Sequence, residues 1–394
     1  LLTDPKVKEW HNAMNAGGDA AFEATMDVIN RFSQGTVPAV VLDRTFQQSI
    51  WDEYIETAER FNEPGRFTAI IGYEWTSTEN GNNLHRNVLY RDGGDVARKM
   101  VPYTTAESFN PEDLWKWMAR YEEATGGRVL ALAHNGNMSN GIMFPVETNP
   151  ATGKALTGDY AKDRARWEPL YETTQIKGDG ETHPLLSPDD AFADFETLAL
   201  GNLNLTVVKT DDMYQYEYTR EALKNGLKLE TELGTNPYKF GLVGSSDTHT
   251  ALAAVEEENY IGKHAGTEPS EERWNHPMAK FAGRQYDGFA MSASGYAAVW
   301  ATENTREALW DAMWRKEVYA TTGPRMLVRF WGGWDFVAAD AESRLPGAVG
   351  YAKGVPMGGE MMAAPSGKAP TFLVAALKDP YGANLDRIQI VKGW

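Results

Sequence analysis

Residues 239–250, KFGLVGSSDTHT, form an apolar run that ends on an acid and an imidazole. Asp247 and His249 are residue types that bind metal ions, and they stand two positions apart after a predicted buried strand. Turn chemistry is the alternative, because Gly, Ser, Asp and Thr favour chain reversal and Asp also caps helices. The choice depends on whether other strands of the chain end in the same way.

Two other predicted strands end on residues of the same kind. FTAIIGYEW, residues 67–75, carries Glu74 near its end, and RVLALAHN, residues 128–135, carries His134. Taken singly, Glu74 reads as a surface acid and His134 as a hydrogen-bonded core histidine. Because the carboxyl ends of parallel strands meet at one edge, their equivalent positions together favour a shared site.

A further histidine, His85, can join this site. It lies in STENGNNLHRNVLY, residues 77–90, a Gly- and Asn-rich loop that leaves the end of the Glu74 strand and could fold back over the same crevice. Imidazoles and carboxylates without sulfur suit Zn²⁺ or Mn²⁺, with iron as an alternative. Two such ions activate a water and stabilise a leaving oxygen, which predicts hydrolysis of an anionic ester by a metal-bound hydroxide, a phosphoester first and a sulfate ester second.

Candidate substrate handles lie in EPLYETTQIKGDGETHP, residues 168–184. Lys177 could neutralise an anionic oxygen of the substrate, and Glu181 or His183 could reach the metals or donate a proton. Arg86 directly follows His85 and could clamp an anion through two hydrogen bonds. An ordinary polar loop and a solvated arginine are the alternatives.

The pattern of elements indicates a parallel sheet covered by helices. Amphipathic helices at 20–32 and 45–61 precede the strand at 67–75, and the order helix, loop, strand recurs at 110–135 and 215–247. Strands that are continuously apolar and separated by helices are typical of such a sheet. Weaker strand signals occur at 168–178 and 202–210.

The pattern of predicted elements changes beyond residue 320. Strand-like segments there, including 386–394, are joined by Gly, Pro and Asn turns without intervening helices. We therefore expect two domains, a metal-dependent hydrolase domain at 1–320 and a small β-rich appendage at 321–394.

Composition restricts the function classes. The chain has 394 residues, a formal net charge of −17 and a pI near 4.9, which argues against nucleic-acid partners because phosphate binding needs clustered Lys and Arg. The chain contains no cysteine, so thiol catalysis and disulfides are excluded, and no run approaches the ~18 apolar residues of a membrane span. These features favour a bacterial periplasmic or secreted protein slightly over a cytoplasmic one, and they leave the oligomeric state open.

Five motifs together resemble the domain-of-unknown-function family 3604, a branch related to the PHP (polymerase and histidinol phosphatase) superfamily. They are IIGYEWTSTENGNNLHRNVLY, LALAHNGN, QIKGDGETHP, GSSDTHT and KEVYATTGPRM, in that order. The resemblance implies an α/β fold of the distorted (β/α)7 barrel type, up to three metal ions and a hydrolase activity. It carries over five metal ligands, namely Glu74, His85, His134, Asp247 and His249, and it strengthens Lys177 and His183 as substrate handles.

The sequence also departs from the PHP pattern. PHP-like proteins begin with a strand ending in His-x-His and a second ending in Asp-His, and neither motif occurs here, so we expect those strands to precede residue 1. Two other functions stay open. An amidohydrolase-like enzyme acting on amides or lactones would use similar ligands and a bridging lysine, for which Lys177 is the candidate. A chain with an incomplete metal site would be a non-catalytic binding module.

Overall fold

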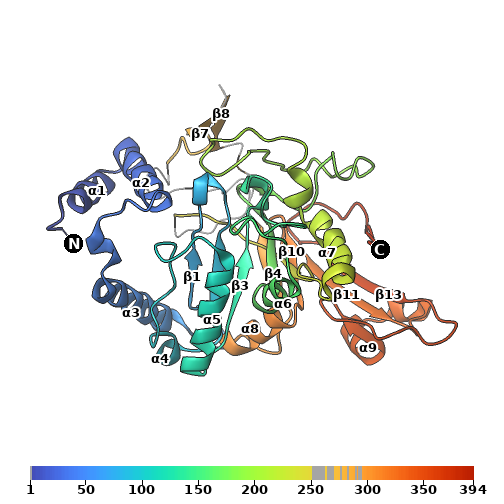
Figure 1. Cartoon of the computed structure of the whole chain (residues 1–394). Helices are drawn as coiled ribbons and strands as arrows, with labels where there is room; N and C mark the ends of the chain where they lie inside the picture. The colour runs from blue at the N-terminus through green and yellow to red at the C-terminus, as the bar shows by residue number, and fades with distance from the viewer. Residues whose placement is uncertain are drawn as a thin grey trace.

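The computed structural model describes residues 2–250, 262–263, 270–275, 277–281, 284–288, 291 and 295–394. A six-stranded mixed sheet lies at its centre (Figure 1). Its strands are β1 (Gly72–Trp75), β2 (Arg86–Tyr90), β3 (Val129–Ala133), β4 (Leu170–Gln175), β5 (Gly178–Asp179) and β6 (Gly241–Gly244). The order is β1-β2-β3-β4-β5, and β6 also pairs with β4.

Four of these strands run in the same direction. β2 is antiparallel to both β1 and β3, whereas β4 is parallel to its neighbours β3 and β6. β1 therefore points the same way as β3, β4 and β6. The carboxyl ends of these four strands lie at one end of the sheet, as the shared-site argument requires.

The predicted (β/α)7 barrel is wrong. Within the described residues the sheet does not close, and β1 and β2 form an antiparallel pair where a barrel would continue with parallel strands. The connection from β1 to β2, residues 76–85, is short and contains no α-helix, and parallel pairing needs a crossover of about a dozen residues or more. The weak strand signal at 202–210 also fails, because the Asn202 side chain accepts from the backbone of Thr206 and closes a local loop.

Some of the α-helices cover the central sheet, and others pack on each other or against the C-terminal strands. The α-helices are α1 (Pro5–Ala16), α2 (Gly18–Ser33), α3 (Arg44–Phe61), α4 (Gly94–Ala97), α5 (Pro111–Thr125), α6 (Gly158–Trp167), α7 (Thr219–Leu233), α8 (Arg306–Trp314) and α9 (Pro346–Lys353). Short 3-10 turns occupy Ala39–Leu42, Glu79–Gly81, Gly136–Met138, Tyr214–Tyr216 and Ala338–Glu342. Local sequence explains α5 well: the Asn110 side chain accepts from Glu112 N at 3.0 Å, Pro111 opens the helix, and Gly126 ends it with φ 74°.

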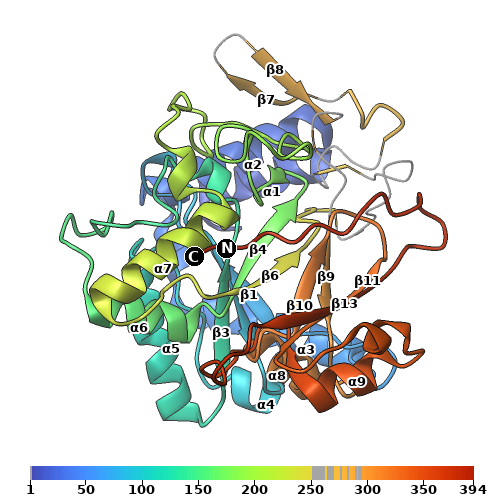
Figure 2. The same ribbon diagram turned by 90° about the vertical axis from the view of Figure 1, so that its right-hand side faces the viewer.

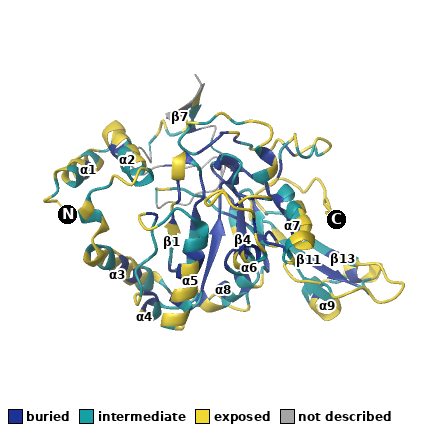
Figure 3. Cartoon of the chain, viewed as in Figure 1, coloured by how far each residue is buried: buried dark blue, intermediate teal, exposed yellow. Residues whose placement is uncertain are grey.

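Strand β3 is buried on both faces (Figure 3). Val129, Ala131 and Ala133 pack in a core with α5 and α6, whereas Leu130 and Leu132 pack in a second core with α8. The two cores explain why this segment is continuously apolar. The helices thus fix the strand that ends at His134 from both sides.

Beyond the central sheet, the C-terminal part is mostly antiparallel (Figures 1 and 2). The strands are β7 (Pro277–Phe281), β8 (Arg284–Asp287), β9 (Tyr296–Val299), β10 (Val318–Thr321), β11 (Leu327–Gly333), β12 (Gly354–Pro356) and β13 (Thr371–Leu377). β9 pairs with β10, and β12-β11-β13 form a separate three-stranded sheet. Residues 386–394, predicted as a strand, belong to no strand. No helix in the described part of the chain is long and apolar enough to cross a bilayer.

Candidate metal centre

Glu74, His85 and His134 come together at the carboxyl end of the sheet. Oε1 of Glu74 lies 3.1 Å from Nδ1 of His85 and 2.9 Å from Nε2 of His134. The ligand atoms of all three residues lie within 4.8 Å of one another. Both imidazoles are buried, and the Glu74 side chain is 32% exposed, so the group opens to solvent on one side.

The register of the strands explains this convergence. Trp75, Arg86, Ala133 and Tyr171 form one row across β1 to β4. Side chains alternate between the two faces of a sheet, so the residues one position closer to the carboxyl ends of β3 and β4 point to the opposite face. Those residues include His85, His134 and Glu172, and Glu74 shares their face.

Neighbouring side chains orient the imidazoles. Nε2 of His85 lies 2.9 Å from Oγ1 of Thr78, and Nδ1 of His134 lies 3.5 Å from the Asn87 amide. Asn83 donates to the backbone oxygen of His134 at 2.8 Å. Such partners on the second nitrogen fix the orientation of metal-binding histidines.

The charges of the group are strongly coupled. Burial raises the pKa of Glu74, but His85 and His134 outweigh burial and hold that pKa well below its usual range. Burial lowers the pKa of His85 despite the nearby carboxylate. Burial also opposes the charged form of His134, yet Glu74 and then Glu172 raise its pKa. The Glu74 carboxylate is therefore ionised, His85 is shifted toward its neutral form, and His134 is shifted toward its protonated form.

The donor set fits a divalent metal ion. Nε2 of His134 is buried and makes no hydrogen bond, although Oε1 of Glu74 lies 2.9 Å away. Two ligands of a tetrahedral zinc, each about 2.0–2.1 Å from the ion, lie roughly 3.3 Å apart. The observed 2.9 and 3.1 Å separations are therefore only a few tenths of an ångström too short. This Glu/His/His group could hold a metal ion.

The structure adds Glu172, which the sequence analysis did not single out. Glu172 is buried in β4, and its Oε2 accepts from the Ser245 hydroxyl, whereas its Oε1 has no hydrogen-bond partner. Burial raises the pKa of this carboxyl, and the charge of Asp247 adds to the effect. A lone acid inside a strand otherwise made of Leu, Tyr, Thr and Gln is the signal that could have found it.

Asp247 lies beside the same group but is held by two lysines. Its carboxylate forms ion pairs with Lys177 and with Lys263, the latter at 2.5 Å, and its φ of 51° is unusual for a residue other than Gly. Burial and the neighbouring Lys177 lower the pKa of Lys263 to about 7. His249 follows closely, with Nδ1 at 3.0 Å from Nζ of Lys263. The roles of Asp247 and His249 as metal ligands stay predictions.

Three predicted substrate handles lie in other surroundings. Arg86 is 1% exposed and pairs with Glu168 at 3.0 Å, on the face of the sheet opposite to His134. Glu181 pairs with Arg220 at 2.7 Å, and the His183 ring stacks on Tyr214 with centroids 4.1 Å apart. Of the four residues predicted to handle the substrate, only Lys177 lies beside the metal-binding group.

The remaining histidines play no part in this site as far as the structure describes them. His11 is exposed and lies near Asn15, which fits its interpretation as solvated. His264 and His276, interpreted in the same way, lie outside the described residues.

A comparison with protein-family models gives one match, to "Protein of unknown function (DUF3604)", and it covers residues 1–394. The chain belongs to the DUF3604 family. No curated protein and no solved structure matches this DUF3604 chain. The family part of the predicted resemblance is thereby confirmed, and the PHP-like part stays a proposal.

Proposed function

We propose that this DUF3604 protein is a metal-dependent hydrolase of small anionic esters. The observation that carries the proposal is the Glu74, His85 and His134 group, with the ammonium groups of Lys177 and Lys263 beside it. Carboxylate and imidazole ligands bind Zn²⁺ or Mn²⁺. Lys177 supplies positive charge for an anion, and Lys263 adds to it when it is protonated. The PHP resemblance supports the same chemistry but contributes no barrel to it.

Glu74, His85 and His134 hold the ion, and Thr78 and Asn87 keep the imidazoles oriented. A divalent ion in such a site activates a water and neutralises charge on the leaving oxygen.

Residues around the three ligands would handle the substrate. Lys177 and Lys263 both pair with the carboxylate of Asp247. An anionic ester oxygen can replace this carboxylate as the partner of one ammonium group. Glu172 offers a buried carboxyl oxygen that is free of hydrogen bonds, which suits a second cation or a proton for the leaving oxygen. The lysines favour phosphate and sulfate esters over neutral ones.

The test begins with metal-stripped protein, to which Zn²⁺ or Mn²⁺ is returned. Bound metal is measured by mass spectrometry, and hydrolysis is assayed with aryl phosphate, phosphodiester, sulfate and carboxylate esters. We expect about one ion or more per chain and metal-dependent cleavage of an anionic ester. Glu74→Gln keeps the side-chain shape and should lose both metal and activity.

The matched control is Glu79→Gln, which neutralises an exposed acid in the loop between β1 and β2. It should behave like the parent. Stoichiometric metal in Glu74→Gln would contradict the proposed site. Bound metal in the parent with no cleavage of any ester would leave the metal site standing and remove the hydrolase.

A further inference from the structure

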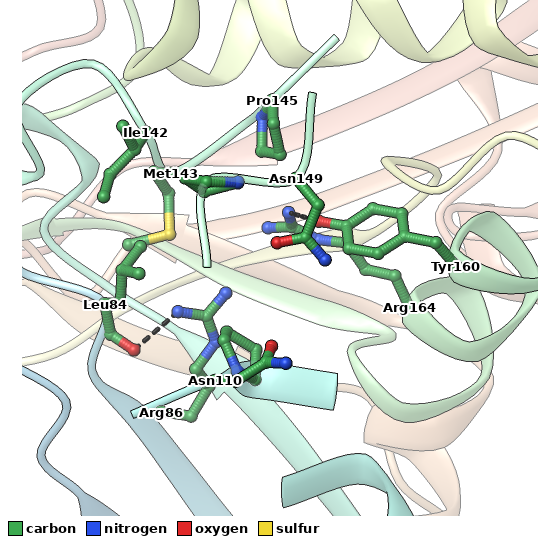
Figure 4. A pocket seen from close by; sticks show the side chains of 11 residues that line it. Leu84, Arg86, Asn110, Ile142, Met143, Pro145, Asn149, Tyr160 and Arg164 are labelled. Atoms are coloured by element: carbon green, nitrogen blue, oxygen red, sulfur yellow. Dashed lines mark hydrogen bonds between the residues drawn. The ribbon is translucent and has the colours of Figure 1, made fainter. Parts of the chain in front are cut away.

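A small cavity lies between β2 and α6, on the face of the sheet opposite to the metal-binding group (Figure 4). Its volume is about 10 Å³, about the space that one water molecule needs. Arg86 reaches it from β2 and Arg164 from α6, and Asn149 and Tyr160 contribute polar atoms to its wall. Both guanidinium groups are at most 2% exposed.

The two arginines share a single carboxylate. Oε1 of Glu168 accepts from Nε of Arg86 at 3.0 Å, and Oε2 of Glu168 lies 3.3 Å from Nε of Arg164. Trp115 also donates to Glu168, at 3.0 Å. Two buried positive charges therefore face one buried negative charge. An uncompensated buried charge is costly, so a second anion would stabilise this arrangement.

No described residue that lines the cavity supplies that charge; the Glu112 carboxylate lies behind the wall, where it accepts from the Asn149 amide at 2.6 Å. Of the described residues that line it, none is acidic. Tyr160 accepts from Nη1 of Arg164 at 3.0 Å, but burial raises the pKa of this phenol, so it stays neutral near pH 7. Tyr238, whose ring faces Arg164, is neutral because burial raises its phenol pKa as well.

The Arg164 side chain also keeps unused hydrogen-bonding capacity. Its Nε is buried and makes no hydrogen bond, although Oε2 of Glu168 lies 3.3 Å away. We propose that this cavity is a binding site for one small monovalent anion, of which chloride is the probe, held between Arg86 and Arg164. This site lies outside the proposed catalytic group and does not depend on it.

The size of the cavity selects the class of anion. A space of about 10 Å³ admits a single-atom anion with slight adjustment of its walls, whereas tetrahedral phosphate or sulfate is too large. The rim carries the partly exposed Asn110 and Pro111 and the exposed Pro150, so an ion can enter from solvent.

The experiment measures the melting temperature of the full chain in sodium chloride and in sodium gluconate at equal ionic strength. Gluconate is too large for the cavity and controls for screening. We expect chloride to raise the melting temperature by about 2 °C or more, in a saturating manner, because an anion that binds only the folded state stabilises it. Arg164→Gln should lose this stabilisation by chloride. Arg166→Gln, on the same helix but outside the cavity, should keep it.

Equal melting curves in the two salts would overturn the proposal, as would a chloride effect that persists unchanged in Arg164→Gln. If Arg164→Gln does not fold, parent crystals soaked in bromide decide the question. An anomalous peak between the two guanidinium groups supports the site, and its absence there overturns it. Neither outcome affects the metal assays on Glu74, so the two proposals can fail separately.

Discussion

The ammonium group of Lys263 lies 2.5 Å from Oδ2 of Asp247, the same carboxylate that pairs with Lys177. One acid thus stands between two lysines whose side chains are at most 12% exposed. Burial opposes the charge on Lys177, but Asp247 raises the pKa of that ammonium group, which keeps it charged. The positive charge of Lys177 is therefore already in place before a substrate anion binds.

Replacing Lys177 by Met should therefore weaken the reaction with charged esters selectively. A charge-assisted hydrogen bond contributes about 1.5–3 kcal/mol, so we expect kcat/KM for an aryl phosphate to fall roughly tenfold to a hundredfold. An uncharged carboxylate ester should lose much less. Lys154→Met, which changes an exposed lysine in a distant loop, is the control. Equal losses for both esters would show that Lys177 serves only the local structure.

Thr78 gives a test of how the metal-binding group is oriented. Thr78→Val removes the hydroxyl 2.9 Å from Nε2 of His85 while keeping size and burial. We expect metal affinity to drop roughly tenfold to a hundredfold, because the imidazole loses its fixed orientation. Thr78→Ser restores the hydroxyl and should recover most of the affinity. Metal titration monitored by calorimetry distinguishes the two variants, and unchanged affinity in Thr78→Val would exclude this role.

Asp179 predicts a pH-dependent contribution to stability. Burial raises the pKa of this carboxyl to about 7, and the charge of Glu181 adds to the effect while Arg220 opposes it. Between about pH 4 and pH 7 the folded protein keeps a proton that the unfolded chain releases. The free energy of unfolding due to this group therefore falls as the pH rises through that range, by about 1.4 kcal/mol per pH unit.

Asp179→Asn stays neutral at every pH and can still accept from Glu181 N, now bound at 2.7 Å. Denaturant unfolding should find the variant close to the parent at pH 4 and more stable than the parent at pH 8. Asp189→Asn, at an exposed position of the following loop, should show no such difference. The same stability difference at both pH values would contradict the raised pKa.

Gly136 tests the tight packing behind His134. A Cβ atom at this position would lie 2.4 Å from the backbone oxygen of Glu217 and 2.7 Å from the hydroxyl of Tyr171. Gly136→Ala should cost about 1–3 kcal/mol in denaturant unfolding and weaken metal binding, since the backbone that leads from His134 must move. Gly347→Ala is the control, because its new methyl meets only the flexible Arg329 side chain at 3.4 Å. Full stability in Gly136→Ala would show that this turn moves freely.

The sequence predicted those features that depend on local patterns. The boundaries of α5 follow from Asn110, Pro111 and Gly126, and the apolar run of β3 follows from its burial on both faces. The convergence of Glu74 with His134 was predictable because each lies at the carboxyl end of a strand and the two strands run in the same direction. His85 was predictable only as a residue of a loop that could fold back, and the hairpin between β1 and β2 achieves this.

The rest depends on contacts between distant segments. The antiparallel position of β2 is set by the short connection at 76–85, whereas the sequence was interpreted as one loop over the shared crevice throughout residues 77–90. Lys263 meets Asp247 without any motif that marks it. Arg86 was expected at the substrate because it follows His85, yet strict alternation along β2 turns it away toward Glu168.

That alternation restricts how this protein can vary. Neighbouring residues at the start of β2 serve different chemistry, with His85 on one face and Arg86 on the other. Sliding β2 by one position along β3 would exchange an imidazole and a guanidinium between the two faces. Insertions or deletions in the loop at 76–84 are therefore tolerable only where they leave the register between β2 and β3 unchanged. An engineered graft of this site must transfer that pairing together with the ligands.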